Sequence, residues 1–142
     1  MPTALSLTDY RTVVEQTPLM IWRCDHHAKC DYFNERWLLF TGRQLEDELG
    51  DGWTAGVHPD DRDRCVRTFL DAFDRREVFE LEYRLRRYDG EYRWVLDSGG
   101  PIIDHAGEFT GYVGSAIDVT DRVDARAQLA RANLKELGLD GV

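Results

Sequence analysis

The apolar residues change their period near the middle of the chain. From Pro59 to Arg75 they recur at helical spacing, whereas in residues 79–86 every second residue is apolar. The first pattern predicts a long amphipathic helix, and the second predicts a strand with one buried face and one wet face. Asp89-Gly90 then indicates a tight hairpin, because both residues tolerate the positive φ that such turns require. The centre of the chain therefore predicts a helix followed by antiparallel strands.

Weaker patterns complete this plan on both sides. A helix over residues 8–17 and short strands over 20–24 and 30–33 are expected before the centre. A returning strand from Tyr92 and a last strand over 109–119 are expected after it, followed by a terminal helix. The order predicts an α+β fold, in which helices pack on one face of a five-stranded antiparallel sheet.

The expected elements divide the chain into a core and two flanking helices. The N-terminal flanking helix takes residues 1–17, the core takes 18–119, and the C-terminal helix takes 120–142. A chain of 142 residues needs no second domain.

Composition restricts the partners that such a chain can have. The formal net charge is −9, and Lys and Arg are not clustered. Counterion release would add little to binding, so we expect neither nucleic acid nor membrane insertion. No apolar run approaches the ~20 residues that a membrane span needs. The three cysteines are too few for a disulfide framework, which favours a reducing, cytoplasmic location.

Four segments carry a combination of motifs that resembles one family. They are Tyr32-Phe33-Asn34 with Trp37, Trp53 with Val57-His58-Pro59-Asp60-Asp61, the hairpin from Tyr83 to Val95, and Gly111 to Arg122 with its Asp-Val-Thr-Asp-Arg ending. In this order they resemble the PAS fold, in the subgroup with a W…HPDD signature. The resemblance covers about residues 17–122.

The resemblance implies a bacterial sensory module that acts without catalysis of its own. Domains of this kind occur in histidine kinases, as in two-component systems, and in diguanylate cyclases, where they pass a signal through a C-terminal helix to an output domain. The chain has no phosphate-binding loop or nucleophile elbow, so we expect no enzyme and no catalytic residues. It is either a stand-alone protein or part of a longer receptor.

The resemblance also places a ligand between the sheet and the helices. Strand alternation and the small residues of the last strand select the pocket residues Trp22, Trp37, Trp53, Phe69, Phe79, Tyr83, Leu96, Ser115 and Ile117. An empty apolar pocket of ~300 Å³ would cost ~7 kcal/mol at ~24 cal/mol per Å³. The space is therefore either packed shut or occupied, and the abundance of tryptophan favours packing.

Two motifs suggest cofactors, but we prefer a simpler interpretation of each. The segment from Cys24 to Cys30 contains thiols and imidazoles, yet its spacing matches no common zinc site, so we expect no metal. His58 could ligate haem, but it also fits the start of the long helix. The flavin-binding cysteine motif is absent, and Cys65 is expected to be a buried structural thiol. We expect no tightly bound haem or flavin and leave the ligand unknown.

The C-terminal helix is the expected output. Val123, Ala127, Ala130, Leu134 and Leu137 form a short heptad seam, which predicts a homodimer. The alternative is that this helix packs back on its own sheet.

Three residues at the start of this helix are predicted to transmit the signal. Asp118 and Thr120 are possible caps, and the resemblance implies an Asp118–Arg122 ion pair between the last strand and the helix. Taken together, the sequence predicts a sensor that responds to a ligand or a partner and acts on a kinase or cyclase output domain. A ligand-free dimerisation adaptor and a haem or metal sensor remain as alternatives.

Overall fold

The computed structural model describes residues 4–139 of the chain. Its elements are α1 (Leu7–Gln16), β1 (Met20–Asp25), β2 (Cys30–Phe33), α2 (Glu35–Thr41), α3 (Leu45–Glu48), the 3-10 turn η1 (Gly52–Gly56), α4 (Pro59–Arg75), β3 (Phe79–Arg86), β4 (Tyr92–Ile103), β5 (Phe109–Asp118) and α5 (Thr120–Glu136). The outermost residues of the two expected flanking segments, 1–3 and 140–142, lie outside the described part.

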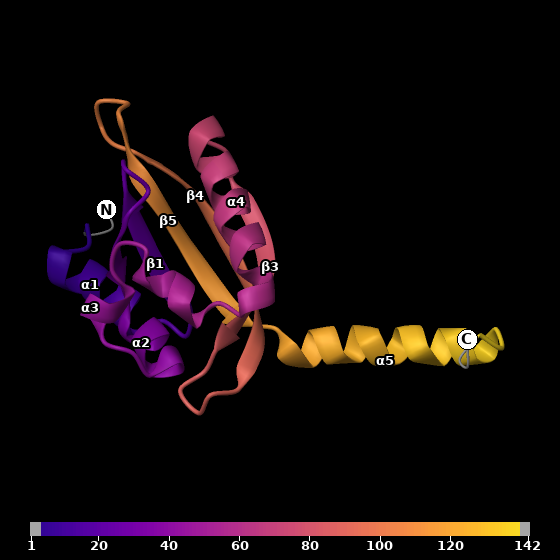
Figure 1. Cartoon of the computed structure of the whole chain (residues 1–142). Coiled ribbons are helices and arrows are strands. Elements are labelled where there is room, and N and C mark those ends of the chain that lie inside the picture. The colour runs from indigo at the N-terminus through magenta and orange to yellow at the C-terminus, as the bar shows by residue number, and fades with distance from the viewer. Residues whose placement is uncertain (1–3, 140–142) are drawn as a thin grey trace.

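The strands form one antiparallel sheet in the order β2-β1-β5-β4-β3. Helices α2, α3 and α4 contribute side chains to the same hydrophobic core as one face of this sheet, which we call the inner face. On the opposite, outer face, α1 lies at the β2 edge, where the Tyr32 hydroxyl donates a hydrogen bond to Glu15, and α5 projects away from the sheet (Figure 1). The predicted α+β architecture with a five-stranded antiparallel sheet is confirmed.

Helix ends follow the capping signals of the sequence. The Asn34 side chain accepts a hydrogen bond from the Trp37 amide at 3.2 Å and starts α2, and Gly42 ends it at a φ of 69°. Pro59 occupies the first turn of α4. Helix α1 begins at Leu7, one residue before the expected start, because Ser6 is its N-cap and forms a reciprocal capping box with Asp9.

Three expected pocket residues lie on the outer face instead. In β4, Val95 pairs with Tyr83 and Asp97 with Leu81, so these β4 residues share the inner face and Leu96 points outward. Leu96 pairs in turn with Ile117 of β5, and Ser98 pairs with Ser115. The prediction was wrong for Leu96, Ser115 and Ile117, because apolar residues occur at both parities of β4 and alternation alone does not choose the buried face.

An ion pair fixes the start of α4 to β3. The Arg84 guanidinium donates two hydrogen bonds to the Asp61 carboxylate, at 2.9 and 2.7 Å, and the Arg84 amide donates a third at 2.9 Å. Asp61 is buried, and these bonds from Arg84 lower its pKa to about 2. The second Asp of the HPDD motif therefore holds helix and sheet together.

Replacing Asp61→Asn should lower the free energy of unfolding by about 2 kcal/mol at pH 7, because the paired guanidinium loses its anion. Urea denaturation measures the change. The neighbouring Asp60→Asn is the control, since the Asp60 side chain is exposed. Equal losses in the two variants would contradict the anchoring role of Asp61.

Candidate functional site

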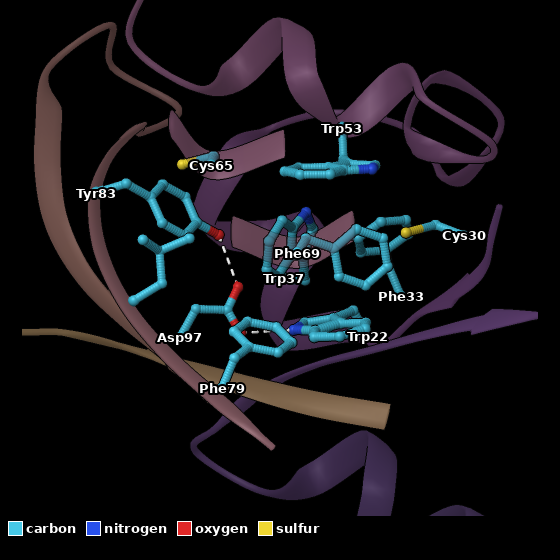
Figure 2. Close-up of a pocket in the computed structure, with 11 residues that line it drawn as sticks. Trp22, Cys30, Phe33, Trp37, Trp53, Cys65, Phe69, Phe79, Tyr83 and Asp97 are labelled. Atoms are coloured by element: carbon cyan, nitrogen blue, oxygen red, sulfur yellow. Dashed lines mark hydrogen bonds between the residues drawn. The ribbon is translucent and has the colours of Figure 1, made fainter. Parts of the chain in front are cut away.

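A small cavity lies between the inner face and the helices. It measures about 30 Å³ and is lined by Trp22, Cys30, Phe33, Trp37, Trp53, Cys65, Phe69, Phe79, Leu81, Tyr83 and Asp97 (Figure 2). A water molecule needs about 10–15 Å³ of such space, so one or two water-sized molecules fit.

The structure brings together the aromatic residues expected there. Trp22, Trp37, Trp53, Phe69, Phe79 and Tyr83 all line the cavity. The set of pocket residues expected from the sequence did not include Cys30, Phe33, Cys65, Leu81 and Asp97. Asp97 was detectable in principle, since it lies opposite Leu81 once the Asp89-Gly90 turn sets the hairpin register.

Aromatic packing accounts for the small size of the cavity. The Phe69 ring lies edge-on to Trp22 at a centroid distance of 5.9 Å and to Trp53 at 6.4 Å. Phe79 stacks on Trp22 at 6.0 Å. These rings come from β1, η1, α4 and β3, so any larger ligand would have to displace side chains from several elements.

Among residues 4–139, Asp97 is the only acid that lines this cavity, and two hydrogen-bond donors hold it. The Trp22 indole Nε1 donates to one carboxyl oxygen at 2.7 Å, and the Tyr83 hydroxyl donates to the other at 2.8 Å (Figure 2). Burial raises the pKa of Asp97 to about 7, although both hydrogen bonds act in the opposite direction. The carboxyl group can therefore gain or lose a proton near neutral pH.

A second buried carboxylate has a structural setting. Glu48 of α3 is 1% exposed and accepts a hydrogen bond from the Trp37 indole at 2.8 Å, and it forms an ion pair with Arg43. These contacts join α3 to α2 behind the cavity. The pairing of a buried carboxylate with Arg43 distinguishes it from Asp97, whose partners are neutral.

The described cavity does not fit a haem or a flavin. About 30 Å³ is far below the ~300 Å³ or more of pockets for molecules of that size. His58 does not line it: the His58 Nδ1 accepts from the Asp60 amide at 3.1 Å and the ring lies against Tyr92. Within residues 4–139, no group of three or more His, Cys, Asp or Glu residues could hold a metal ion.

The start of α5 is tied to β4. Asp118 forms an ion pair with Arg93 at 2.8 Å and accepts hydrogen bonds from the amide and hydroxyl of Thr120. Arg122 lies 3.8 Å from Glu82 of β3. The expected Asp118–Arg122 pair was therefore wrong, because β4 is the neighbour of β5 and Arg93, two residues before the register partner Val95, reaches the Asp118 carboxylate with its side chain.

The expected dimer seam lies along an exposed helix. No residue of α5, which falls wholly within the described range, is buried, and the helix points away from the sheet (Figure 1). Val123 is partly covered, whereas Ala127, Ala130, Leu134 and Leu137 are exposed. The alternative that this helix packs back on its own sheet is thus not what the structure shows.

Known proteins resemble this chain along most of its length. Residues 31–116 match the family model described as PAS fold. The uncharacterized protein y4lL of Sinorhizobium fredii is 41% identical over 119 residues, which are 84% of this chain and 14% of that protein. The peroxide stress-activated histidine kinase mak1 of Schizosaccharomyces pombe is 28% identical, over 93% of this chain and 9% of the kinase.

A solved structure agrees. The sensory box histidine kinase/response regulator structure from Burkholderia thailandensis is 29% identical, with a TM-score of 0.64 over 90% of this chain and 96% of that one. These similarities are to sensor domains, which are not catalytic themselves. The chain belongs to the PAS fold family. It spans about a seventh or less of the curated relatives named above.

The raised pKa of Asp97 should make stability fall as the pH rises through about 7. The folded protein binds this proton more tightly than the unfolded chain, whose aspartates titrate near 3.8. The contribution is therefore complete below about pH 4 and is lost with a slope of up to ~1.4 kcal/mol per pH unit. Chemical denaturation from pH 4 to 8 measures it.

Asp97→Asn is the control for this measurement, because it removes the titrating group and keeps a side chain of the same shape. The free energy of unfolding should depend less steeply on pH in Asp97→Asn than in the wild type over this window. If both proteins show the same slope, Asp97 does not titrate there.

Proposed function

We propose that this PAS domain is a sensory module in which a change at the cavity reaches an output domain through α5. The observation that supports the proposal is that β4 serves both places. Asp97 of β4 faces the cavity, and Trp94 of the same strand holds the start of α5. A shift of β4 along or across the sheet would therefore move both.

Three contacts join β4 to the beginning of α5. The Trp94 amide donates to the Thr120 hydroxyl at 2.9 Å, and the Val119 amide donates to the Trp94 carbonyl at 2.7 Å. The Arg93–Asp118 ion pair adds a third. We therefore propose Asp118 and Thr120 as the transmission residues. They act through their contacts with β4 rather than through a contact with Arg122 on α5.

Two weaker ion pairs help to orient α5 relative to the sheet. Arg126 forms an ion pair with Glu82 on the outer face of β3 at 2.9 Å, and Arg122 approaches the same carboxylate. Exposed ion pairs contribute about 0–1 kcal/mol each. A stimulus worth a few kcal/mol could therefore turn α5 without disturbing the sheet.

The size of the cavity restricts the stimulus. Protonation of Asp97 or entry of a water-sized molecule needs no rearrangement, whereas a larger ligand must displace Trp53 or Phe69. We propose that this core responds to small changes, and that its output is a histidine kinase or cyclase domain in the same or another cytoplasmic chain. The kinase mak1 and the Burkholderia sensor kinase support a kinase output.

A ligand-free adaptor is the second candidate function. Its support is the outer face, where Val113 is 44% and Ile117 41% exposed and a shallow hollow runs past Gly99 and Ser115. Such a face could receive another protein while the inner core stays packed. The two functions differ in what a change at the cavity does: the adaptor leaves α5 unaffected, whereas the sensor alters it, and the hydrogen-exchange experiment below measures this. Within residues 4–139, no helix combines the length and apolarity of a membrane span.

Asp97→Asn should speed amide hydrogen exchange at residues 119–124 roughly fivefold, as a loss of about 1 kcal/mol of local stability would. The reason is that weaker bonds to Trp22 and Tyr83 loosen β4, which holds Val119 and Thr120. Asp63→Asn, at an exposed position of α4, is the control. If the change stays within β3 and β4, the proposed relay is wrong.

Leu134→Glu should convert the proposed homodimer to a monomer, because it places a charge in the exposed seam. Leu129→Glu is the matched control: Leu129 is equally a leucine of α5, is 62% exposed, and lies off the seam. Sedimentation velocity measures the association state. A wild-type monomer, or equal effects of the two changes, would refute dimerisation through this seam.

A further inference from the structure

We propose that Cys24 and Cys30 are a redox-sensitive pair, which a hydroperoxide converts into an intramolecular disulfide across β1 and β2. The two cysteines are direct partners in the register of these strands, and both thiols are free and buried. The inference goes beyond the proposed sensory function and depends neither on a ligand nor on a relay.

The backbone geometry at this pair suits a disulfide. The Cys30 amide donates to the Gly50 carbonyl at 3.2 Å, and the Gly50 amide donates back at 2.7 Å, so the Cys30 backbone groups point away from β1. The next bond of the hairpin runs from the Asp25 amide to the Lys29 carbonyl. Cys24 and Cys30 therefore form a non-hydrogen-bonded pair, in which Cα atoms are about 4.5 Å apart. Disulfides span Cα separations of about 4.4–6.8 Å.

A β-bulge turns the two side chains to the same face. Arg23 pairs with Tyr32 and Cys24 with Cys30, so Asp31 is an extra residue in β2. Without it, Cys30 and Phe33 would face opposite sides of the sheet, because they are three positions apart. With it, both are buried, and Asp31 is exposed. The bulge thus places the Cys30 thiol beside Cys24 in the inner core.

The cavity provides space beside Cys30 for a small oxidant. Cys30 lines the cavity, which admits molecules about the size of water, such as hydrogen peroxide. Cys65 also lines it, but lies across the cavity from Cys30, with aromatic rings between them (Figure 2). Cys24 is therefore the partner that the geometry offers to Cys30.

The reaction balances with one peroxide for each pair. The Cys30 thiolate attacks one peroxide oxygen, the O–O bond breaks, and the departing hydroxide takes a proton to give water. The Cys24 thiol loses its proton, its thiolate attacks the sulfur of the Cys30 sulfenic acid, the S–O bond breaks, and the departing hydroxide takes up a proton to leave as a second water. The sulfurs lose two electrons in total, and the peroxide gains them.

Burial makes this reaction slow. It raises the pKa of Cys24 to about 11 and that of Cys30 still further, so few molecules carry a thiolate at pH 7. The pair should therefore respond to sustained exposure rather than to a brief pulse, and its oxidation should be faster at higher pH.

Peptide mapping tests the proposal on the full chain. Trypsin cuts after Arg23, Lys29 and Arg36, so Cys24 and Cys30 fall in separate peptides, 24–29 and 30–36. The folded protein is incubated with hydrogen peroxide, its remaining thiols are alkylated, and it is digested without reductant. The expected product is the 24–29/30–36 disulfide-linked pair, which disappears after reduction.

The controls use the third cysteine. Cys65→Ala should form the same linked peptides at the same rate, whereas Cys24→Ala and Cys30→Ala should not form them. Far-UV circular dichroism confirms that each variant is folded. Should a variant not fold, the wild-type peptide map alone still decides. A Cys30–Cys65 link, a link between chains, sulfenic or sulfinic acid alone, or three intact thiols after prolonged exposure would each overturn the proposal.

Discussion

The sheet depends on a carboxyl group that it has to bury. Asp97 lies in the middle of β4 and is bonded by Trp22 from β1 and Tyr83 from β3. A buried carboxyl group without such donors would cost several kcal/mol, so these bonds restrict the positions of three strands at once. Since β5 lies between β1 and β4, the indole reaches Asp97 across the close backbone of Gly114, where a side chain would collide with Trp22.

Dependence on strand pairing separates the features that the sequence predicted from those that it did not. Capping residues and the Asp89-Gly90 turn defined the elements, because their effects are local. The aromatic lining of the cavity was also predictable, since Phe79 and Tyr83 alternate clearly with charged residues. The inner face of β4 was not, because Trp94, Val95 and Leu96 are all apolar and only pairing with β3 selects Val95. Asp118 was likewise assigned to Arg122 because Arg93 is close only after the strands pair.

The same packing limits the stimuli to which the proposed sensor can respond. The sequence left the ligand unknown and favoured a packed core, and the aromatic side chains indeed leave space for only one or two water-sized molecules. What remains adjustable is the charge of Asp97 and the redox state of the nearby thiols. Both affect strands of the inner face, and β4 connects that face to the first turn of α5.

The central position of β5 has a consequence for biosynthesis. Before residues 109–118 leave the ribosome, the β1–β2 and β3–β4 hairpins have no strand to join them, and each exposes an unpaired edge. The sheet closes only when its last strand inserts between two preformed halves. Because α5 begins immediately after that strand, this helix is synthesised next to a domain that has only just become able to fold. A ribosome that pauses within β5 would therefore carry two hairpins with unpaired, aggregation-prone strand edges and no folded domain.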